Sequence, residues 1–262
     1  MPSYADITTD DPNVVKRWLQ NRRLDDALWH VDIEHGSGFG GRMLDFGGGD
    51  GALCRRFLSR FPDASVVSYD PSATMLEQAV AGVQAPANQT TETTETTESN
   101  QANQANQAVG STTSLESGSF DVITCCEVVE HLPAAQIDEA LEEIFRLLAP
   151  TGLLVLGVPN ELYLMALGKG VFRLIRRSGE YDARWDTILP AAKGHPREDR
   201  PVHDIDGLPF IYPHTGFDYR TTLADLRRHG FQVVGSHGSP IRRGPRFVNT
   251  ELYLVCRKSI GR

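Results

Sequence analysis

Apolar and polar positions along the chain alternate in a way that predicts strands and helices in turn. The apolar run RMLDF (42–46) predicts a short strand, and DGALCRRFLSRF (50–61), with apolar residues at helical spacing, predicts a helix. The next segments, SVVSYD (65–70) and SATMLEQAVAGV (72–83), repeat that order. Ahead of them, apolar residues at helical spacing predict an N-terminal helix over 11–35 that packs on the domain.

The second half of the pattern continues in the same way. FDVITCCEVV (120–129) is a nearly continuous apolar run, typical of a central strand in a parallel sheet, and AAQIDEALEEIFRLL (134–148) predicts a helix. LLVLGVP (153–159) predicts another buried strand, and TLADLRRHGFQVVGS (222–236) predicts a helix followed by a strand. ELYLVCRK (251–258) predicts a last strand, which we expect to pair antiparallel because no crossover helix is evident before it.

One segment between these elements has a different composition. Within residues 86–112 the chain repeats Thr-Thr-Glu and then Ala-Asn-Gln, and the repeats contain no large apolar side chain. Such a segment cannot offset its ordering entropy by burial, so we expect a disordered low-complexity insertion.

Length, charge and cysteine content limit the possible classes. At 262 residues and 40% hydrophobic, the chain is long enough for a single domain over 1–262 with its own core. A formal charge of −8 argues against a main partner bound through nucleic-acid phosphates. The four cysteines lack zinc-site or disulfide spacing, and the chain shows neither signal-peptide features nor an apolar run of membrane-spanning length. We therefore expect a cytoplasmic protein.

The stretch MLDFGGGDGALCRRF (43–57) places a glycine turn between a strand and a helix, which is a ligand-binding arrangement. The glycines also satisfy the loose dinucleotide pattern, so the turn alone is a weak signal. Asp45 beside the turn and Asp50 within it would repel a pyrophosphate, whereas a cationic ligand is favoured. S-adenosylmethionine (SAM) carries no phosphate and has an ammonium and a sulfonium group, and Asp45 can pair with the ammonium directly or through water.

Four motifs follow one another in an order that resembles class I SAM-dependent methyltransferases, in the group of ubiquinone-biosynthesis-like and other small-molecule methyltransferases. They are LDFGGGDG (44–51), YDPSATMLEQA (69–79), SFDVITCCEVVEHLP (119–133) and LLAPTGLLVLGVPNE (147–161). The resemblance implies an α/β, Rossmann-like seven-stranded sheet that is mostly parallel, with an antiparallel last strand and helices on both faces.

The resemblance also implies roles for individual residues. The glycines would line the cofactor, Asp70 would hold its ribose, Met75 or the chain around Pro71 would flank the adenine, and Cys126 and Glu127 would border the methyl group. An acid that commonly contacts the adenine is replaced here by the region of Ser111 and Thr112. The expected cofactor-binding residues are Asp45, Gly47, Gly49, Gly51, Asp70, Pro71, Met75, Cys126 and Glu127.

A candidate general base follows the central strand. His131, next to Glu130, lies on the sheet edge that carries the glycine turn, where open parallel sheets bind ligands. A structural role in starting the next helix is an equal alternative. Glu127, Glu130 and His131 also resemble the E-x-x-E-H arrangement of small-RNA terminal 2′-O-methyltransferases, where a later histidine, here His214, completes a metal site. The spacing of His214 does not match that family, and we assign no metal ligands.

The segment 161–220 separates the last motif from the C-terminal helix and strands, and we expect it to cover the substrate. It begins with an amphipathic helix, over 162–178, whose cations could contact a membrane surface or simply remain in water. After this helix comes a stretch rich in Pro, Gly, His and aromatics without clear periodicity. From the helix and this stretch we select five candidates for the acceptor pocket: Tyr163, His203, Tyr212, His214 and Tyr219.

The function expected from the sequence is methyl transfer from SAM to a small-molecule or lipid-like acceptor, more to oxygen than to carbon or nitrogen. Three alternatives remain open: a metal-dependent 2′-O-methyltransferase acting on RNA, a nucleotide-linked enzyme such as a dehydrogenase, and a protein that binds SAM or a nucleotide without catalysis.

Overall fold

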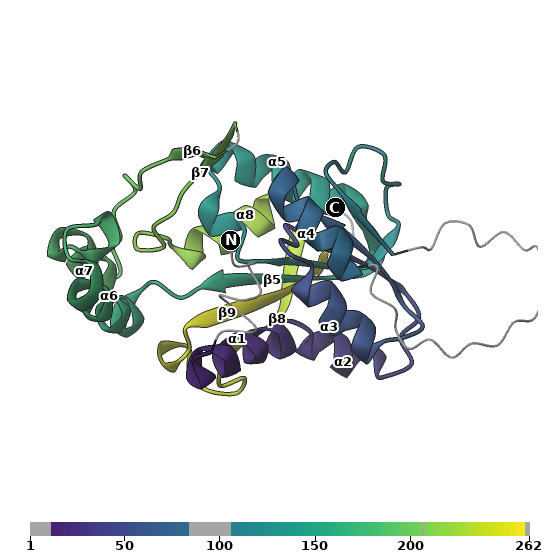
Figure 1. Cartoon of the computed structure of the whole chain (residues 1–262), viewed down its shortest axis with the longest axis horizontal. Helices are drawn as coiled ribbons and strands as arrows, with labels where there is room; N and C mark the ends of the chain where they lie inside the picture. The colour runs from purple at the N-terminus through teal and green to yellow at the C-terminus, as the bar shows by residue number, and fades with distance from the viewer. Residues whose placement is uncertain (1–11, 84–105, 206, 260–262) are drawn as a thin grey trace, which may run out of the picture.

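The computed structural model describes residues 12–83, 106–205 and 207–259. Within these ranges the main strands form one seven-stranded sheet in the order β3-β2-β1-β4-β5-β9-β8 (Figure 1). Its strands are β1 (Arg42–Phe46), β2 (Ser65–Tyr69), β3 (Gln107–Val109), β4 (Phe120–Cys126), β5 (Leu148–Pro159), β8 (Phe231–Ser239) and β9 (Glu251–Lys258).

Strand directions follow the expected scheme. β1 pairs in parallel with β2 and β4, β2 pairs in parallel with β3, and β4 pairs in parallel with β5. β9 is antiparallel to both β5 and β8, so β8 runs with the other strands. The predicted Rossmann-like sheet with an antiparallel last strand is therefore confirmed.

Helices cover both faces of this sheet. The α-helices are α1 (Val14–Ala27), α2 (Trp29–His35), α3 (Ala52–Arg60), α4 (Ala73–Val83), α5 (Ala134–Leu147), α6 (Tyr163–Arg177), α7 (Trp185–Ala192) and α8 (Tyr219–Arg228). Short 3₁₀ turns are η2 (Val129–His131), η3 (Tyr181–Ala183) and η4 (Arg246–Val248). No helix in the described ranges is both long and apolar enough to cross a membrane.

The core is divided by the sheet into two layers. On one face, Leu141 and Ile144 of α5 and Leu226 of α8 are buried in a cluster with inward side chains of the central strands. On the other face, Leu28 and Phe57 are buried in a second cluster with the opposite side chains of the same strands. Burial on both faces explains why the central strands are continuous apolar runs rather than alternating ones.

The N-terminal segment holds two helices where the pattern predicts one. The Asn13 side chain accepts hydrogen bonds from the backbone N–H groups of Val15 and Lys16, at 3.0 and 3.1 Å, which caps α1. α1 then ends at Ala27, and α2 begins at Trp29. The apolar spacing continues through this break, so the pattern did not reveal it.

The low-complexity segment lies mostly outside the described residues, which resume at residue 106. The expectation of disorder over 86–112 is wrong at its C-terminal end, because Gln107–Val109 forms β3 on the edge of the sheet. The Asn106 side chain accepts a hydrogen bond from the backbone N–H of Val66 at 3.0 Å, which fastens the start of this strand to β2.

The insertion over 161–220 is more ordered than its sequence indicates. After α6 come η3, α7 and a two-stranded hairpin of β6 (His203–Ile205) and β7 (Leu208–Phe210). Figure 1 shows α6 and α7 together at one end of the molecule, and the hairpin close to the helices of the main domain. The two helices meet at Gly170, where a Cβ would lie 2.6 Å from a methyl carbon of Ile188.

Candidate functional site

The glycine turn joins β1 to α3 at the carboxyl edge of the sheet. Gly47, Gly49 and Gly51 have φ values of +78°, +55° and +74°, a region that L-residues with a Cβ rarely adopt. A Cβ at Gly47 would lie 2.4 Å from a methyl carbon of Val128, whereas Gly49 has nothing within 4 Å of the equivalent position. The backbone at Gly49 is therefore the part of the turn that a ligand can approach closely.

Asp70 directly follows β2 and is hydrogen-bonded to the turn. One carboxylate oxygen accepts from the backbone N–H of Gly49 at 3.0 Å, and the other accepts from that of Ser72 at 2.9 Å. Burial raises the pKa of Asp70, while these two hydrogen bonds oppose the rise. Pro71 is exposed and Met75 is half-buried at the start of α4. The ribose and adenine roles of these residues stay predictions.

Asp45 lies beneath the turn, with 3% of its surface exposed. One of its carboxylate oxygens accepts a hydrogen bond from the Thr124 hydroxyl at 2.8 Å, and the other lies 3.8 Å from the Cys54 sulfur. Burial raises the pKa of Asp45 from 3.8 to about 7, although both hydrogen bonds lower it. Asp50, by contrast, accepts from the backbone N–H of Ala52 at 3.1 Å and supports the start of α3.

The tip of β4 carries an acid that is already paired. Glu127 has a φ of +59°, and its carboxylate lies 2.5 Å from the guanidinium of Arg23 on α1. Burial alone would raise the pKa of Glu127, but Arg23 holds it well below its usual range. Arg23 also contacts Glu251 at the start of β9, at 3.1 Å. Cys126, just before Glu127, is half-buried.

Glu130, one turn further on, has no such partner. Its side chain is fully buried, and neither carboxylate oxygen has a hydrogen-bond donor within the described residues. The Arg200 guanidinium donates to the backbone carbonyl of Glu130, at 2.6 Å, and not to its carboxylate. Burial first, and then the charge of Glu127, raises the pKa of Glu130 well above its usual value.

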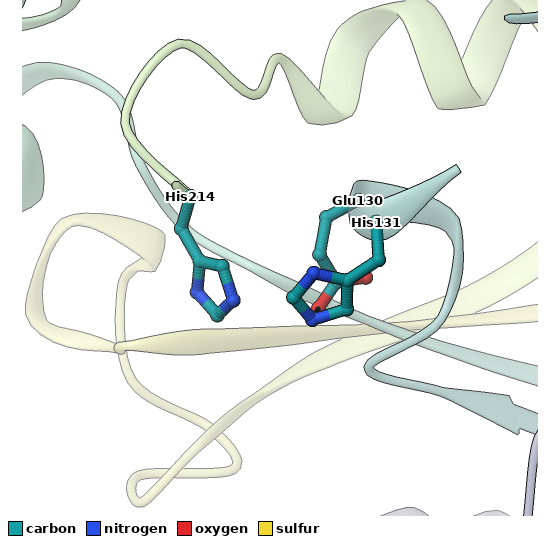
Figure 2. A group of neighbouring side chains, drawn as sticks. All are labelled: Glu130, His131 and His214. Carbon is teal, nitrogen blue, oxygen red and sulfur yellow. Dashed lines mark ion pairs between the residues drawn. The ribbon is translucent and has the colours of Figure 1, made fainter. Parts of the chain in front are cut away.

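Two histidines lie beside this carboxyl group (Figure 2). The Nδ1 atom of His131 is 2.7 Å from the backbone carbonyl of Ile211, a contact that only an N–H can make. Burial lowers the pKa of His131, which favours the neutral ring, and in that form Nε2 keeps its lone pair. That Nε2 is 4.0 Å from a Glu130 oxygen. The ring of His214 lies 4.9 Å from the ring of His131, and burial lowers the pKa of His214 to about 4.

One ligand atom from each of Glu130, His131 and His214 lies within 4.8 Å of the others. A carboxylate and two neutral imidazoles at this separation can remove a proton from an acceptor or hold a divalent cation. The structure thus brings together Glu130, His131 and His214, three residues selected from the sequence. Glu127, which was selected with them, forms an ion pair with Arg23.

The other acceptor-pocket candidates lie in different surroundings. His203 and Tyr212 are exposed, with ring centroids 5.2 Å apart at the β6–β7 hairpin. Tyr163 begins α6 with a φ of +55°, and its hydroxyl accepts a hydrogen bond from Arg220 at 3.2 Å. Tyr219, the first residue of α8, is buried in the core cluster. Only His214 joins the Glu130 cluster directly.

The expectation that the cations of the amphipathic helix contact a membrane surface or water is wrong for two of them. Lys169 and Arg173 do not remain in water but bind the fully buried Glu161, at 2.9 and 2.8 Å. Burial would raise the pKa of Glu161, yet these two cations hold it at about 2. The exposed side of α6 is instead apolar, and Ile175 is 80% exposed.

The sequence analysis did not single out several charged residues that lie at this edge of the sheet. Arg23, Glu161, Arg200 and Glu251 stand on four different elements or loops, and each finds its partner only through the fold. Glu161 was visible as the acid closing the motif that ends in VPNE, and Glu251 as an acid starting an otherwise apolar strand. Neither position carried a signal of burial.

Comparison with known proteins gives two kinds of similarity. Residues 44–154 match a family model described as a methyltransferase domain. Ubiquinone biosynthesis O-methyltransferases of Psychrobacter cryohalolentis and Psychrobacter arcticus are each 31% identical over 159 residues, covering 58% of this chain and 55% of the relative. The chain therefore spans about half the length of the curated relatives it matches.

Solved structures show the fold over nearly the whole chain. The 1,6-didemethyltoxoflavin-N1-methyltransferase of Burkholderia thailandensis, with bound S-adenosylhomocysteine, superposes with a TM-score of 0.53 at 14% identity, covering 93% of this chain and 81% of its own. The magnesium protoporphyrin IX methyltransferase of Synechocystis PCC 6803 gives a TM-score of 0.57 at 14% identity, with coverages of 95% and 89%.

Proposed function

Because residues 44–154 belong to the methyltransferase domain family and the chain has the class I methyltransferase fold, we propose that it transfers a methyl group from SAM to an oxygen of a small-molecule or lipid-like acceptor. The observation that carries this proposal is the shared sheet edge. There the Gly49 turn and Asp70 lie near the tips of β1 and β2, and the Glu130–His131 pair follows the tip of β4.

The electrostatics of the turn support SAM as the methyl donor. The open backbone at Gly49 permits close approach of a nucleoside, and Asp70 presents a carboxylate suited to ribose hydroxyls. Asp45 adds negative charge beneath the turn, which favours a cationic amino-acid end over a pyrophosphate. Two structural neighbours were solved with S-adenosylhomocysteine bound, the product that remains when SAM gives up its methyl group.

An oxygen acceptor is supported by the curated relatives and by the Glu130–His131 pair. A hydroxyl must lose its proton as the methyl group arrives, and the free Nε2 of His131 can accept it. The O–CH₃ bond forms while the S–CH₃ bond breaks, and the proton goes to His131. The hydrogen bond to Ile211 and the stacked ring of Phe210, 4.4 Å away, hold the imidazole in place.

A lipid-like acceptor, with peripheral membrane contact through residues 162–178, is supported by the exposed apolar side of α6. Leu164, Phe172 and Ile175 are all more than half exposed, at 56%, 59% and 80%. The RNA alternative has less support, because cations of the insertion such as Arg173 and Arg177 are paired with acids.

The first experiment separates the classes of ligand. Thermal shift of the full chain with SAM, S-adenosylhomocysteine or NAD should show stabilisation by the first two alone, since only a ligand of the folded state stabilises it. Stabilisation by NAD alone would show that the nucleotide-linked alternative is correct. A screen of phenols, catechols, lipid quinols and RNA with isotopically labelled SAM then identifies the acceptor, and absence of any turnover favours the non-catalytic binder.

The second experiment tests the base. His131→Ala should lower kcat about 10²- to 10⁴-fold with little change in SAM affinity, as expected for a lost general base. His229→Ala, which removes a histidine paired with Asp138 outside the site, is the matched control. Unchanged turnover in His131→Ala would remove that residue from the mechanism.

A further inference from the structure

We propose that a cavity beside the edge strand β8 binds the phosphate group of a phosphate monoester. The cavity has a volume of about 450 Å³ and lies between the start of α2, β8 and the loop that joins β8 to β9. Its walls contain no residue of the glycine turn and neither Glu130 nor His131. It is therefore separate from the candidate methyl-transfer site, and the inference goes beyond the proposed function.

The walls of the cavity carry positive charge without matching acids. Arg242, Arg243 and Arg246 line it, whereas no aspartate or glutamate of the described residues does. Arg242 is paired with the buried Asp26. For Arg243 and Arg246 the described parts of the chain supply no carboxylate partner. Two guanidinium groups without acids, on a chain of formal charge −8, form a local positive site that attracts an anion.

The floor of the cavity is a packed group of rings. The ring centroid of His237 lies 4.9 Å from that of Trp29 and 4.9 Å from that of Tyr253, on which it stacks at an interplanar angle of 13°. The Arg242 guanidinium lies over Trp29, 5.4 Å from the ring centroid. Because these side chains hold one another in place, a ligand would not have to order them, and this lowers the cost of binding.

The loop that presents the arginines is also held in place. Asn249 is fully buried, and its side chain accepts from the backbone N–H of Ile241 at 2.8 Å and donates to the carbonyls of Ile241 and Pro245 at 3.0 and 3.2 Å. The Asn160 side chain donates to the carbonyl of Arg246 at 3.0 Å. The backbone on both sides of Arg243 is thus fixed, so the two arginines extend from a defined position.

The chemistry of the donors favours a phosphate monoester over a carboxylate. A monoester carries about −1.5 to −2 charges at neutral pH and has three terminal oxygens, so it can bridge two guanidinium groups, whereas a carboxylate has two oxygens and one charge. A guanidinium nitrogen of Arg246 lies 3.4 Å from the Ser236 hydroxyl, which adds a neutral donor to the same wall.

A phosphate monoester can come from a soluble metabolite or from the headgroup of phosphatidic acid. The arginines are flanked by two apolar side chains, Ile241 and Phe247, which are 51% and 55% exposed. A lipid would contact these side chains as well as the arginines, whereas a soluble ester would contact the cavity alone.

Calorimetric titration of the full chain with glycerol 3-phosphate tests the soluble source. Saturating S-adenosylhomocysteine keeps the cofactor site filled, and glycerol is the uncharged control ligand. We expect one binding site for the ester and none for glycerol. Arg243→Gln and Arg246→Gln should each raise the Kd about 10-fold, the loss of one charge-assisted contact. Arg227→Gln, which removes an exposed arginine of α8 outside the cavity, should leave the Kd unchanged.

Co-sedimentation with phosphatidylcholine vesicles, with and without phosphatidic acid, tests the lipid source. Glycerol 3-phosphate binding without a preference for phosphatidic acid identifies a soluble ligand. Binding to phosphatidic acid vesicles alone, lost in Arg243→Gln and Arg246→Gln, identifies the lipid headgroup. Binding in neither experiment, or binding that both substitutions leave intact, would overturn the proposal, and so would displacement of the ester by S-adenosylhomocysteine. The methyl-transfer proposal does not depend on these outcomes.

Discussion

Asp45 offers the sharpest test of how the glycine turn balances stability against ligand binding. Its carboxyl group is buried beneath the turn, and burial raises its pKa from 3.8 to about 7. The variant Asp45→Asn keeps the size of the side chain and an acceptor for the Thr124 hydroxyl, but removes the charge. We expect a protein that at pH 8 is more stable than the wild type and binds SAM less tightly.

The sign of the stability effect follows from the two pKa values. Between pH 4 and pH 7 the unfolded chain loses the Asp45 proton while the folded protein keeps it, so rising pH lowers the free energy of unfolding until about pH 7. A shift of about 3 units corresponds to roughly 4 kcal/mol at most. The new amide must find a partner beside Cys54, which costs roughly 2–3 kcal/mol, so we expect a net gain of about 1–2 kcal/mol at pH 8 and a net loss of about 1–2 kcal/mol at pH 4.5.

Urea unfolding of both proteins at pH 4.5 and pH 8 measures this difference directly. At pH 8 the gain should raise Tm by a few degrees, at roughly 2–4 °C per kcal/mol for a chain of this size. Asp63→Asn removes a carboxylate that is exposed and should show no such pH-dependent gain. Calorimetric titration with SAM at pH 8 should give about 10-fold weaker binding to Asp45→Asn, the loss of one charge-assisted contact.

Two results would refute this reasoning. If Asp45→Asn were destabilised equally at both pH values, the carboxylate would be supporting the turn as an ion and not resisting burial. If SAM bound both proteins with the same affinity at pH 8, the charge of Asp45 would have no part in selecting the cofactor.

Three further substitutions, with Gly36→Ala as a control, test other parts of the structure. Gly49→Ala and Gly36→Ala both place a Cβ at positive φ in open space, so each should lower the free energy of unfolding in urea by about 1 kcal/mol. Only Gly49→Ala should also weaken SAM binding, measured by calorimetry. Equal SAM binding by both variants would contradict the proposed approach of the cofactor to Gly49. Asp70→Asn should raise the Kd for SAM about 10- to 100-fold, and an unchanged Kd would remove the ribose contact. Arg173→Met leaves the buried Glu161 with one cation fewer and should lower the free energy of unfolding by about 3–5 kcal/mol, seen as a fall in Tm of roughly 10 °C. A small change in Tm would show that the remaining ion pair is sufficient.

The glycine-turn side of the candidate site was largely predictable because its residues sit close together in the chain. A strand, a glycine turn and a helix follow one another over residues 42–60, and Asp70 ends the next strand. In a parallel sheet the carboxyl ends of neighbouring strands meet at one edge, so the turn and the acid had to be neighbours once the order of elements was known.

The His131 side of the candidate site was less predictable because it is assembled from distant segments. Residues 181–220 lack periodicity, yet they contain α7 and the β6–β7 hairpin, whose short elements depend on packing against α6 and η2 rather than on their own pattern. The basic helix was interpreted as a surface feature because nothing in its spacing shows that a buried glutamate lies opposite Lys169 and Arg173.

The sequence by itself determined the sheet, its antiparallel last strand and the place of the glycine turn, because these depend on local hydrophobic periods and on the short connections between consecutive elements. Only the tertiary structure decided which acids are paired and which is not. Glu127 and Glu130 are three positions apart and look alike in the chain, but Arg23 from α1 reaches the first, and no donor in the described residues reaches the second. Pairing of buried charges depends on distances of a few ångströms between elements far apart in sequence, and such distances exist only after the chain has folded.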